Sequence, residues 1–489
     1  HDNGMGTIRT IMVGFPPIES NKGIPLVSQN RQFQWFNSPT YIYPVIPATA
    51  ATMLKEKGYD VIFKDAVAER LTVMQWLDFI DAKKPDLVLF EAKTPVIRYY
   101  WDVIDSLKNR HKSIITVLAG DHVTALPMES MERSSVDYVL TGGDFDFLLA
   151  NLVDHIADGT ALEPGIYYRD KGAVVSSGHF TLSHDLNAAP VIDRELTNWK
   201  QYAYANGNYK RLPGTYIMSG RDCWHHACTF CSWTTLFPNF RVRAVDHVVD
   251  EIESLVTRFH IREVMDDTGC FPIGSWLHNF CDELIRRKLN RRVTIDCNMR
   301  FGALTYDEYR HMRKAGFRFI LFGLESANQA TLDRVVKRLS VSDILASCRD
   351  AKRAGLSPHI TVMFGYPWEN EDDVARTIAL SRELMIKGYA HTMQATIVIP
   401  YPGTPLFDEC DRADILVTRD WERYDMREPI MTGKMDAAAI KRAVQELYSL
   451  SFHPRFLLHK LLSLRDADDI AYYYRAFRKV FFGHLKDFS

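Results

Sequence analysis

Residues 221–231 read Arg-Asp-Cys-Trp-His-His-Ala-Cys-Thr-Phe-Cys, so that Cys223, Cys228 and Cys231 fall within nine residues. The other five cysteines of the 489-residue chain are scattered singly. Three thiolates on one short loop can hold three irons of a [4Fe–4S] cube and leave the fourth iron open. An open iron can chelate the amino and carboxylate groups of a small molecule and deliver one electron to it. The loop therefore indicates an iron–sulfur site that carries out chemistry.

Two structural interpretations compete with this one. The cysteines could form a structural zinc site, which needs four closed ligands, the fourth coming from His225 or His226. They could also be buried cysteines with no ligand, although three within nine residues on a predicted loop argue against this. The two histidines are expected to support the loop or face solvent rather than bind iron.

Downstream of the loop, β-branched and apolar runs alternate with amphipathic stretches such as 245–259 and 372–387. Six strand–helix units in this stretch predict a six-stranded open barrel, because a closed barrel of this type has eight. After Pro405 the pattern becomes helical and rich in aromatic residues. The predicted strands are 216–218, 263–265, 293–295, 319–322, 360–364 and 395–399.

Upstream of the loop, five short apolar runs bounded by Gly, Pro or Asp are separated by helical stretches. This pattern predicts a doubly wound parallel sheet, whose ligands bind beyond the carboxyl ends of the strands. A hairpin over 165–178 follows. The predicted strands are 8–13, 60–63, 86–90, 114–118 and 137–140.

The expected fold class is thus α/β, in four parts. A Rossmann-like domain over 1–185 precedes a linker over 186–212, a partial barrel over 213–405 and a helical C-terminal domain over 406–489 that faces substrate. Basic and acidic side chains nearly balance, 59 against 61, which gives no reason to expect a nucleic acid or an anionic membrane as partner. No apolar window approaches the roughly 18 residues of a membrane span, and the first residues lack signal-peptide character. We therefore expect a soluble, cytoplasmic protein.

The cysteine loop, its place after the first barrel strand and the barrel itself resemble the radical S-adenosylmethionine (SAM) superfamily. The usual loop of that family has three residues between its first two cysteines, whereas this one has four. The other motifs follow in the family's order, each at the end of a strand. They are Met265-Asp266-Asp267-Thr268, Asn298-Met299-Arg300, Phe322-Gly323-Leu324-Glu325-Ser326, Phe364-Gly365-Tyr366-Pro367-Trp368-Glu369 and Tyr401-Pro402-Gly403-Thr404-Pro405.

The resemblance implies how these residues bind SAM. The cysteines hold the cluster and Phe230 is the aromatic residue common between the last two. Asp266 and Asp267 accept hydrogen bonds from the methionine ammonium, since carboxylates are strong acceptors for a cation, and Arg300 pairs with the methionine carboxylate. The ribose side is lined by Glu325 and Ser326, the adenine side by Gly365 and Pro367, and the substrate by Tyr401.

The first ~180 residues resemble the cobalamin-binding domain that precedes many such barrels. Leu118-Ala119-Gly120-Asp121-His122-Val123-Thr124 is similar to one of its loops, and Thr141-Gly142-Gly143-Asp144 to a second turn where small residues admit a large ligand. The Asp-x-His-x-x-Gly sequence that ligates cobalt is absent, which implies base-off cobalamin without a histidine below the metal. A domain for another nucleotide, or for none, is the alternative, although no Gly-x-Gly-x-x-Gly follows the first strand. The implied contacts are Pro16, Thr94, Pro95, Gly120, Asp121, His122, Thr124, Gly142 and Gly143.

By this resemblance the chain is expected to be a cobalamin-dependent radical SAM methyltransferase. It would use a 5′-deoxyadenosyl radical and methylcobalamin to methylate an unactivated carbon of a small molecule or of a peptide or protein side chain. A flavodoxin or ferredoxin would supply electrons. A cyclase, rearrangement or sulfur-insertion enzyme with the same cofactors is the second hypothesis, and a non-enzymatic corrinoid or redox sensor is the third.

Overall fold

A computed structural model describes residues 8–27, 33–38 and 40–479 of the chain. The chain divides into two compact units. The first comprises 1–205 with two short returns, 232–239 and 420–422, and the second comprises the rest. Residues 480–489 of the expected helical tail lie outside the described part. Among the described helices, none is both long and apolar enough to cross a bilayer.

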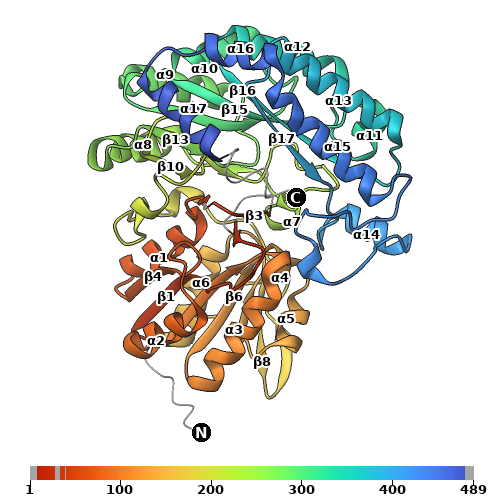
Figure 1. The fold of residues 1–489 in the computed structure, drawn as a ribbon. Coiled ribbons are helices and arrows are strands. Elements are labelled where there is room, and N and C mark those ends of the chain that lie inside the picture. Colours follow the sequence, from red (N-terminus) through yellow and green to blue (C-terminus); the bar gives the residue numbers. More distant parts are fainter. Residues whose placement is uncertain (1–7, 28–32, 39, 480–489) are drawn as a thin grey trace. The chain divides into compact units, whose positions relative to one another are not determined.

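The first unit is built on a seven-stranded sheet in the order β4-β1-β5-β6-β7-β8-β9, drawn in red to yellow in Figure 1. The first five strands are parallel, as predicted, and β8 and β9 add an antiparallel hairpin at one edge. Every residue of β5 is buried, as expected for a strand covered by helices on both faces. The strands are β1 (Thr10–Phe15), β4 (Asp60–Asp65), β5 (Leu87–Ala92), β6 (Ile115–Gly120), β7 (Tyr138–Leu140), β8 (Ile166–Asp170) and β9 (Ala173–Ser176).

Strand order fixes where this unit can hold a ligand. In chain order the parallel strands run second, first, third, fourth, fifth, so the winding reverses between β1 and β5. Doubly wound sheets bind ligands in the crevice at such a reversal, beyond the carboxyl ends of the strands. The helices of the unit are α1 (Val45–Glu56), α2 (Val73–Lys83), α3 (Ile97–Arg110), α4 (Asp121–Ala125), α5 (Pro127–Arg133) and α6 (Phe145–Asp158).

Three further segments pack on this unit. Residues 186–205, which the sequence assigned to a linker, bury Trp199 and Tyr202 in it. The return at 232–239 contains the short helix α7 (Trp233–Leu236), and the return at 420–422 contributes the buried Trp421.

The second unit is a parallel sheet of six strands in the sequential order β10-β13-β14-β15-β16-β17, as predicted. These strands are β10 (Gly214–Ile217), β13 (Glu263–Asp266), β14 (Thr294–Met299), β15 (Phe317–Glu325), β16 (Ser357–Phe364) and β17 (Thr392–Ile397). The connecting helices are α8 (Val245–Phe259), α9 (Ser275–Arg286), α10 (Tyr306–Lys314), α11 (Gln329–Arg334), α12 (Val341–Arg353) and α13 (Glu371–Ile386).

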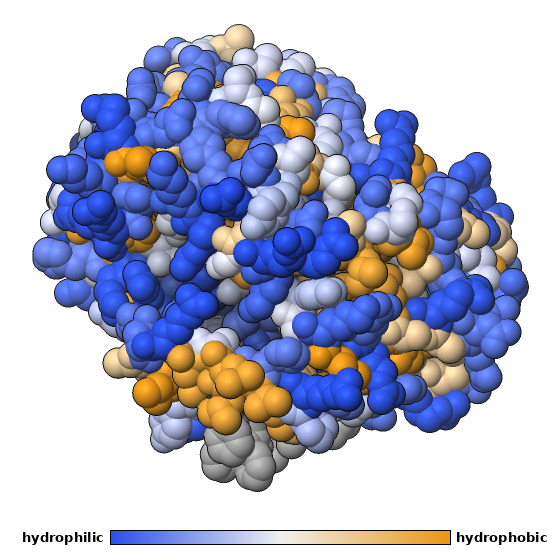
Figure 2. Space-filling model, turned by 90° about the horizontal axis from the view of Figure 1, so that it is seen from above, coloured by the Kyte–Doolittle hydropathy of each residue, from blue (hydrophilic) through white to orange (hydrophobic). Residues whose placement is uncertain are grey.

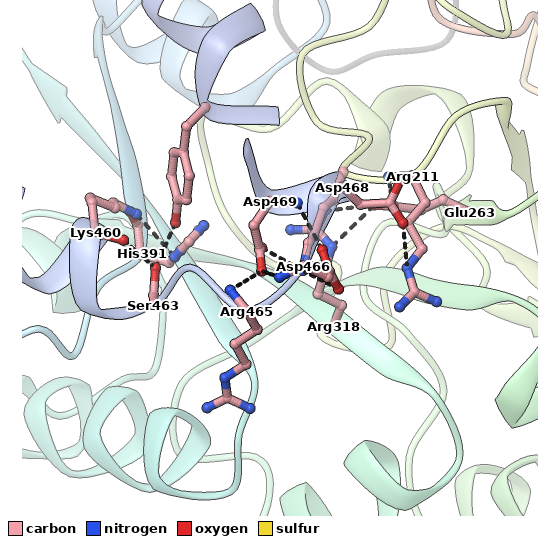
Figure 3. A network of polar contacts seen from close by, with 12 residues as sticks. Arg211, Glu263, Arg318, His391, Lys460, Ser463, Arg465, Asp466, Asp468 and Asp469 are labelled. Atoms are coloured by element: carbon pink, nitrogen blue, oxygen red, sulfur yellow. Dashed lines mark hydrogen bonds and ion pairs between the residues drawn. The ribbon is translucent and has the colours of Figure 1, made fainter. Parts of the chain in front are cut away.

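The helical tail comprises α14 (Pro405–Arg412), α15 (Ala437–Ser449), α16 (Pro454–Leu462) and α17 (Ala467–Lys479). Helix α17 lies at the amino ends of the barrel strands, where Asp468 forms an ion pair with Arg262 next to β13 (2.6 Å) and Tyr472 lies over Arg318 of β15. Figure 3 shows Asp468 in one network with Arg211, Glu263 and Arg318. This end of the strands is opposite to the one that carries the cysteine loop, so α17 lies away from the loop, whereas α14 contacts it through the Leu406 N–H and the Thr229 carbonyl.

Candidate functional site

The cysteine loop follows β10 and is held by backbone hydrogen bonds from other segments of its unit. Thr229 donates its N–H to the Val335 carbonyl (3.1 Å) and accepts from the N–H of Leu406 (2.9 Å). The N–H of Cys231 donates to the Cys228 carbonyl (3.2 Å), which folds the second half of the loop into a turn. All three thiols are unoxidised and half-buried.

The two histidines of the loop have structural roles. His225 Nε2 donates to the Val336 carbonyl (2.7 Å), and burial, then the nearby Arg300, lowers the pKa of its ring to about 4. His226 lies 3.3 Å from the Asp222 carboxylate. No three His, Cys, Asp or Glu side chains in the described ranges surround a single metal ion.

Arg300, at the end of β14, is placed to receive an anion. One guanidinium nitrogen, Nη2, donates to the carbonyls of Lys337 and Arg338, and the group lies 5.5 Å from the ring of Trp224. Its other terminal nitrogen, Nη1, is buried and has no hydrogen-bond partner among the residues that the structure describes. A buried donor left open is costly, so this one fits the carboxylate of a ligand such as methionine.

Lys337 is a site residue that the sequence analysis missed. Its Nζ donates to Glu325 Oε1 (2.7 Å), and both side chains are about nine-tenths buried. Burial opposes the charged amine, yet the Glu325 carboxylate keeps the pKa of Lys337 above its usual value, and Cys228 adds to this effect. Its ammonium also lies 5.9 Å from the ring of Phe230. A single lysine twelve residues after the glutamate of a Gly-Leu-Glu-Ser motif gives no signal by itself.

The two acidic residues at the end of β13, Asp266 and Asp267, differ in their hydrogen bonding. Both carboxylate oxygens of Asp266 accept hydrogen bonds, from the N–H and hydroxyl of Ser219 and from those of Thr268. Asp266 thus clamps the start of the cysteine loop to β13. Asp267 is also buried. The pair's predicted role at the methionine ammonium now favours Asp267, because Asp266 is fully used by protein donors.

The motifs after β15 and β16 are joined through Glu369. Its Oε1 accepts from the hydroxyls of Ser326 (2.6 Å) and Thr331 (2.6 Å), while Oε2 is buried without a partner. Burial raises the pKa of Glu369, and these hydrogen bonds oppose the shift. Gly365, with a φ of +99°, and the buried Tyr366, whose hydroxyl is also unpartnered, complete the turn that leads to Pro367.

Tyr401 is placed by a hydrogen bond rather than left open to a substrate. Its hydroxyl donates to the Tyr424 carbonyl (3.0 Å), and the side chain is buried. This contact pins the segment after β17 to the tail of the same unit.

In the first unit, the predicted cobalamin contacts gather at the carboxyl ends of neighbouring strands. The hydroxyl of Thr124 donates to the Gly120 carbonyl (2.6 Å) and accepts from the N–H of Gly142 (2.9 Å). His122 is fully buried, with Nδ1 3.2 Å from the Thr94 hydroxyl and Nε2 2.9 Å from Glu129. Both of its ring nitrogens are therefore used, and it cannot serve as a metal ligand in this arrangement.

A cluster of buried charges lies beside the reversal of the sheet. Lys93, just after β5, is 3.7 Å from the Asp121 carboxylate at the start of α4. Glu91, the fifth residue of β5, is fully buried, and its Oε2 has no partner. Burial raises the pKa of Glu91 to about 7, with Lys93 opposing the shift. Pro16 and Pro95 are buried at the same strand ends. The sequence analysis used Asp121 and missed Lys93 and Glu91, although a charged pair inside a buried strand end is a usable signal.

The glycine turn after β7 is covered by side chains of its own unit. A Cβ on Gly143 would lie 1.8 Å from the ring of Phe237, and one on Gly142 2.6 Å from the ring of Phe180. The N–H of Gly143 donates to the Leu236 carbonyl (2.7 Å). The return that begins one residue after Cys231 is therefore docked on this turn.

Known protein families match both the first part of the chain and the part that contains the cysteine loop. Residues 37–146 match the B12 binding domain and residues 217–381 match the radical SAM superfamily. An uncharacterised methyltransferase, PH0819, of Pyrococcus horikoshii is 27% identical over 84% of this chain and 88% of its own. An anaerobic magnesium-protoporphyrin IX monomethyl ester cyclase of Rubrivivax gelatinosus is also 27% identical, over 85% of this chain and 74% of its own.

The fold is similar to that of a solved radical SAM methyltransferase, TsrM of Kitasatospora setae, whose structure holds cobalamin and a [4Fe–4S] cluster. The TM-score is 0.68 at 16% identity, covering 91% of this chain and 89% of that one. The Arg300 Nη1, buried and open among the described residues near the cysteine loop, fits the carboxylate of an amino acid bound at a cluster. With a B12-binding domain ahead of a radical SAM domain, the chain belongs to the cobalamin-dependent radical S-adenosylmethionine enzymes, whose cofactors are a [4Fe–4S] cluster, SAM and cobalamin.

Proposed function

We propose that this enzyme is a methyltransferase that places a methyl group on an unactivated carbon of its substrate. The observation that carries the proposal is His122, the histidine of the predicted cobalamin loop, whose two ring nitrogens are taken up by Thr94 and Glu129. With both ring nitrogens occupied, His122 would support the loop around a bound cobalamin rather than serve as a ligand to its metal. The cluster with SAM supplies a radical, and cobalamin supplies the methyl group, when these groups are bound.

The chain's own residues bind the cofactors, orient them and exclude water from the site. Cys223, Cys228 and Cys231 would hold the cluster, and Arg300 would receive the methionine carboxylate through its open Nη1. Lys337 holds Glu325 in place next to the loop, since the two groups share a buried hydrogen bond. Protein contacts hold Arg300 and Glu325 in place, which lowers the cost of ordering them on binding.

Incubation with SAM labelled in its methyl carbon tests the proposal. The anaerobically reconstituted enzyme with a reductant should move label into the extracted corrinoid and, when substrate is present, into product, and should release 5′-deoxyadenosine. The variant with all three cysteines changed to Ala should lose bound iron and 5′-deoxyadenosine formation together. Enzyme that makes 5′-deoxyadenosine but never labels the corrinoid or the product would contradict the methyltransferase assignment.

A cyclase with the same cofactors is the second candidate, and the 27% identity to the anaerobic cyclase of Rubrivivax gelatinosus favours it. This candidate predicts 5′-deoxyadenosine with no transfer of the labelled carbon, so the same experiment separates the two. We further propose that a flavodoxin or ferredoxin is the electron donor and that the substrate is a small molecule or a peptide or protein side chain.

A further inference from the structure

Helix α16 exposes a stripe of leucines on the second unit. Leu457, Leu458, Leu461 and Leu462 are 49%, 52%, 63% and 72% exposed, and their spacing places them along one side of a nine-residue helix. Only Phe456 is buried in this helix. We call the four leucines the α16 stripe.

The stripe is part of a larger apolar surface. Phe452, just before α16, is 54% exposed and Leu464, just after it, is 37% exposed. Figure 2 looks down on the end of the molecule that carries α16 in Figure 1, and apolar patches interrupt the hydrophilic surface there. Single exposed leucines are ordinary, but contiguous apolar surface on a helix marks an interaction site.

Two of the three acids of this segment are closely paired within the unit, which leaves cations exposed next to the stripe. Asp468 pairs with Arg262 (2.6 Å) and Asp469 with Lys210 (2.5 Å), both within the unit, whereas Asp466 is exposed. By contrast, Arg455 in α16 and Arg465 just after it are exposed and form no ion pair with any described residue. In Figure 3 the Arg465 side chain points away from the network. The net charge of −2 for the whole chain conceals this local excess of cations.

From the α16 stripe and these arginines, we propose that α16 docks on the surface of an anionic phospholipid bilayer as a peripheral anchor. Leucines that enter the boundary between headgroups and acyl chains gain by burial, and arginines beside them gain by attraction to anionic lipids. A second copy of the chain is a poorer occupant. A nine-residue helix cannot supply the roughly 800 Å² per partner of a stable interface, and the arginines of two copies would repel each other.

The anchor lies away from the chemistry and does not depend on the proposed function. His459 binds the Ile386 carbonyl at the end of α13 (3.0 Å), and Lys460 binds His391 just before β17. These contacts fix α16 at the amino ends of the barrel strands. The cysteine loop lies at their carboxyl ends, so docking leaves that end of the barrel uncovered.

Sedimentation with vesicles tests the anchor. The full-length enzyme should bind vesicles of phosphatidylcholine with about a third phosphatidylglycerol, and bind pure phosphatidylcholine more weakly. The Leu461→Glu/Leu462→Glu variant should bind anionic vesicles about tenfold more weakly or worse. The matched control is Met74→Glu/Val191→Glu, which changes residues of 61% and 54% exposure in the first unit and should bind like wild type. Replacing Arg455 and Arg465 with Gln should remove the preference for anionic vesicles.

Three outcomes would overturn the anchor. The first is wild-type enzyme that stays in the supernatant with both vesicle types. The second is a dimer by light scattering that the Leu461→Glu/Leu462→Glu variant dissociates, which would assign the stripe to a second copy. The third is a rise in binding of an apolar fluorescent dye when the chain is ended at Lys479, which would assign the stripe to residues 480–489. Iron content and far-ultraviolet circular dichroism that match wild type would show that the variants are folded.

Discussion

Glu91 is a carboxylic acid inside a parallel sheet, and its burial couples folding to pH. Its pKa is raised from 4.5 to about 7, so between these values the folded protein holds a proton that the unfolded chain releases. The contribution of Glu91 to the free energy of unfolding is therefore fully present below pH 4.5 and is lost as the pH rises through 7. The loss reaches about 3 kcal/mol at most, the equivalent of a shift of roughly 2.5 pH units.

We expect Glu91→Gln to remove this dependence. Between pH 5.5 and 8, the unfolding midpoint of the first unit should fall in wild type and change less in the variant, with both proteins in the same cofactor state. Asp78→Asn, which changes an exposed carboxylate paired with Arg110, is the control and should follow wild type. Parallel pH curves for wild type and Glu91→Gln would show that Glu91 ionises normally.

The Lys337–Glu325 pair should tolerate the loss of both charges better than the loss of one. Lys337→Met leaves a buried carboxylate without its partner, which costs about 3–5 kcal/mol. The double variant Lys337→Met/Glu325→Gln should recover most of this stability but not 5′-deoxyadenosine formation, because the amine beside Cys228 is still missing. Thermal unfolding and product analysis separate the two effects. A single variant as stable as wild type would mean that the pair is open to water.

Residue types at the site could be predicted from sequence better than their partners. The cysteines, Arg300, Glu325 and Glu369 stand in motifs at strand ends, and the structure brings them to one end of the barrel sheet. The structure also shows Asp266 fully used by Ser219 and Thr268, and Lys337 reaching back to Glu325. The Lys337–Glu325 and Ser219–Asp266 pairings join positions 12 and 47 residues apart through side-chain geometry, which strand periodicity does not encode.

At the scale of elements, the segment from Val335 to Arg338 braces the cysteine loop. Val336 and Arg338 have φ angles of +56° and +49°, which β-branched and long side chains adopt only under constraint. Three consecutive carbonyls of the segment accept from Thr229, His225 and Arg300. The strained turn thus places its carbonyls where donors of the loop and of Arg300 can bond to them.

Removing one of these donors should loosen the loop. We expect His225→Leu to lower the stability of the closed loop by about 1 kcal/mol, and so to speed the loss of iron to a chelator about fivefold. His225→Gln can still donate to the Val336 carbonyl and serves as the control. Equal rates of iron loss from both variants and wild type would contradict a bracing role.

Strand and helix positions were predictable because apolar runs of about five residues between helices can bury themselves only in a parallel sheet. Both sheets and the hairpin at 165–178 are confirmed. The boundaries of the units were harder to predict, since residues 186–205 look polar yet bury Trp199 and Tyr202. The burial of scattered aromatic residues in such a segment depends on the surface available to it, which the local sequence does not show.

For the whole molecule, the feature that no local pattern predicts is the exchange of segments between the units. Residues 420–422, far along the chain, belong to the first unit, where Trp421 donates to Glu129 Oε1 (2.9 Å) and its ring centroid lies 5.4 Å from that of His122. Glu129 is in turn the partner of His122 Nε2. The tail of the chain thereby completes the environment of the predicted cobalamin loop.

Trp421→Ala should therefore weaken the first unit and make the two units unfold separately. Truncating a buried tryptophan costs about 3–5 kcal/mol, and the loss falls on the first unit because Trp421 packs there. We expect calorimetry of the cofactor-free protein to resolve two transitions, with the earlier one belonging to the first unit, and cobalamin to bind more weakly because Glu129 and His122 lose a neighbour. Trp421→Phe keeps the apolar packing but not the N–H donor, so it should lie between wild type and Trp421→Ala. Unchanged unfolding and cobalamin affinity in Trp421→Ala would show that the return at 420–422 rests on the first unit without supporting it.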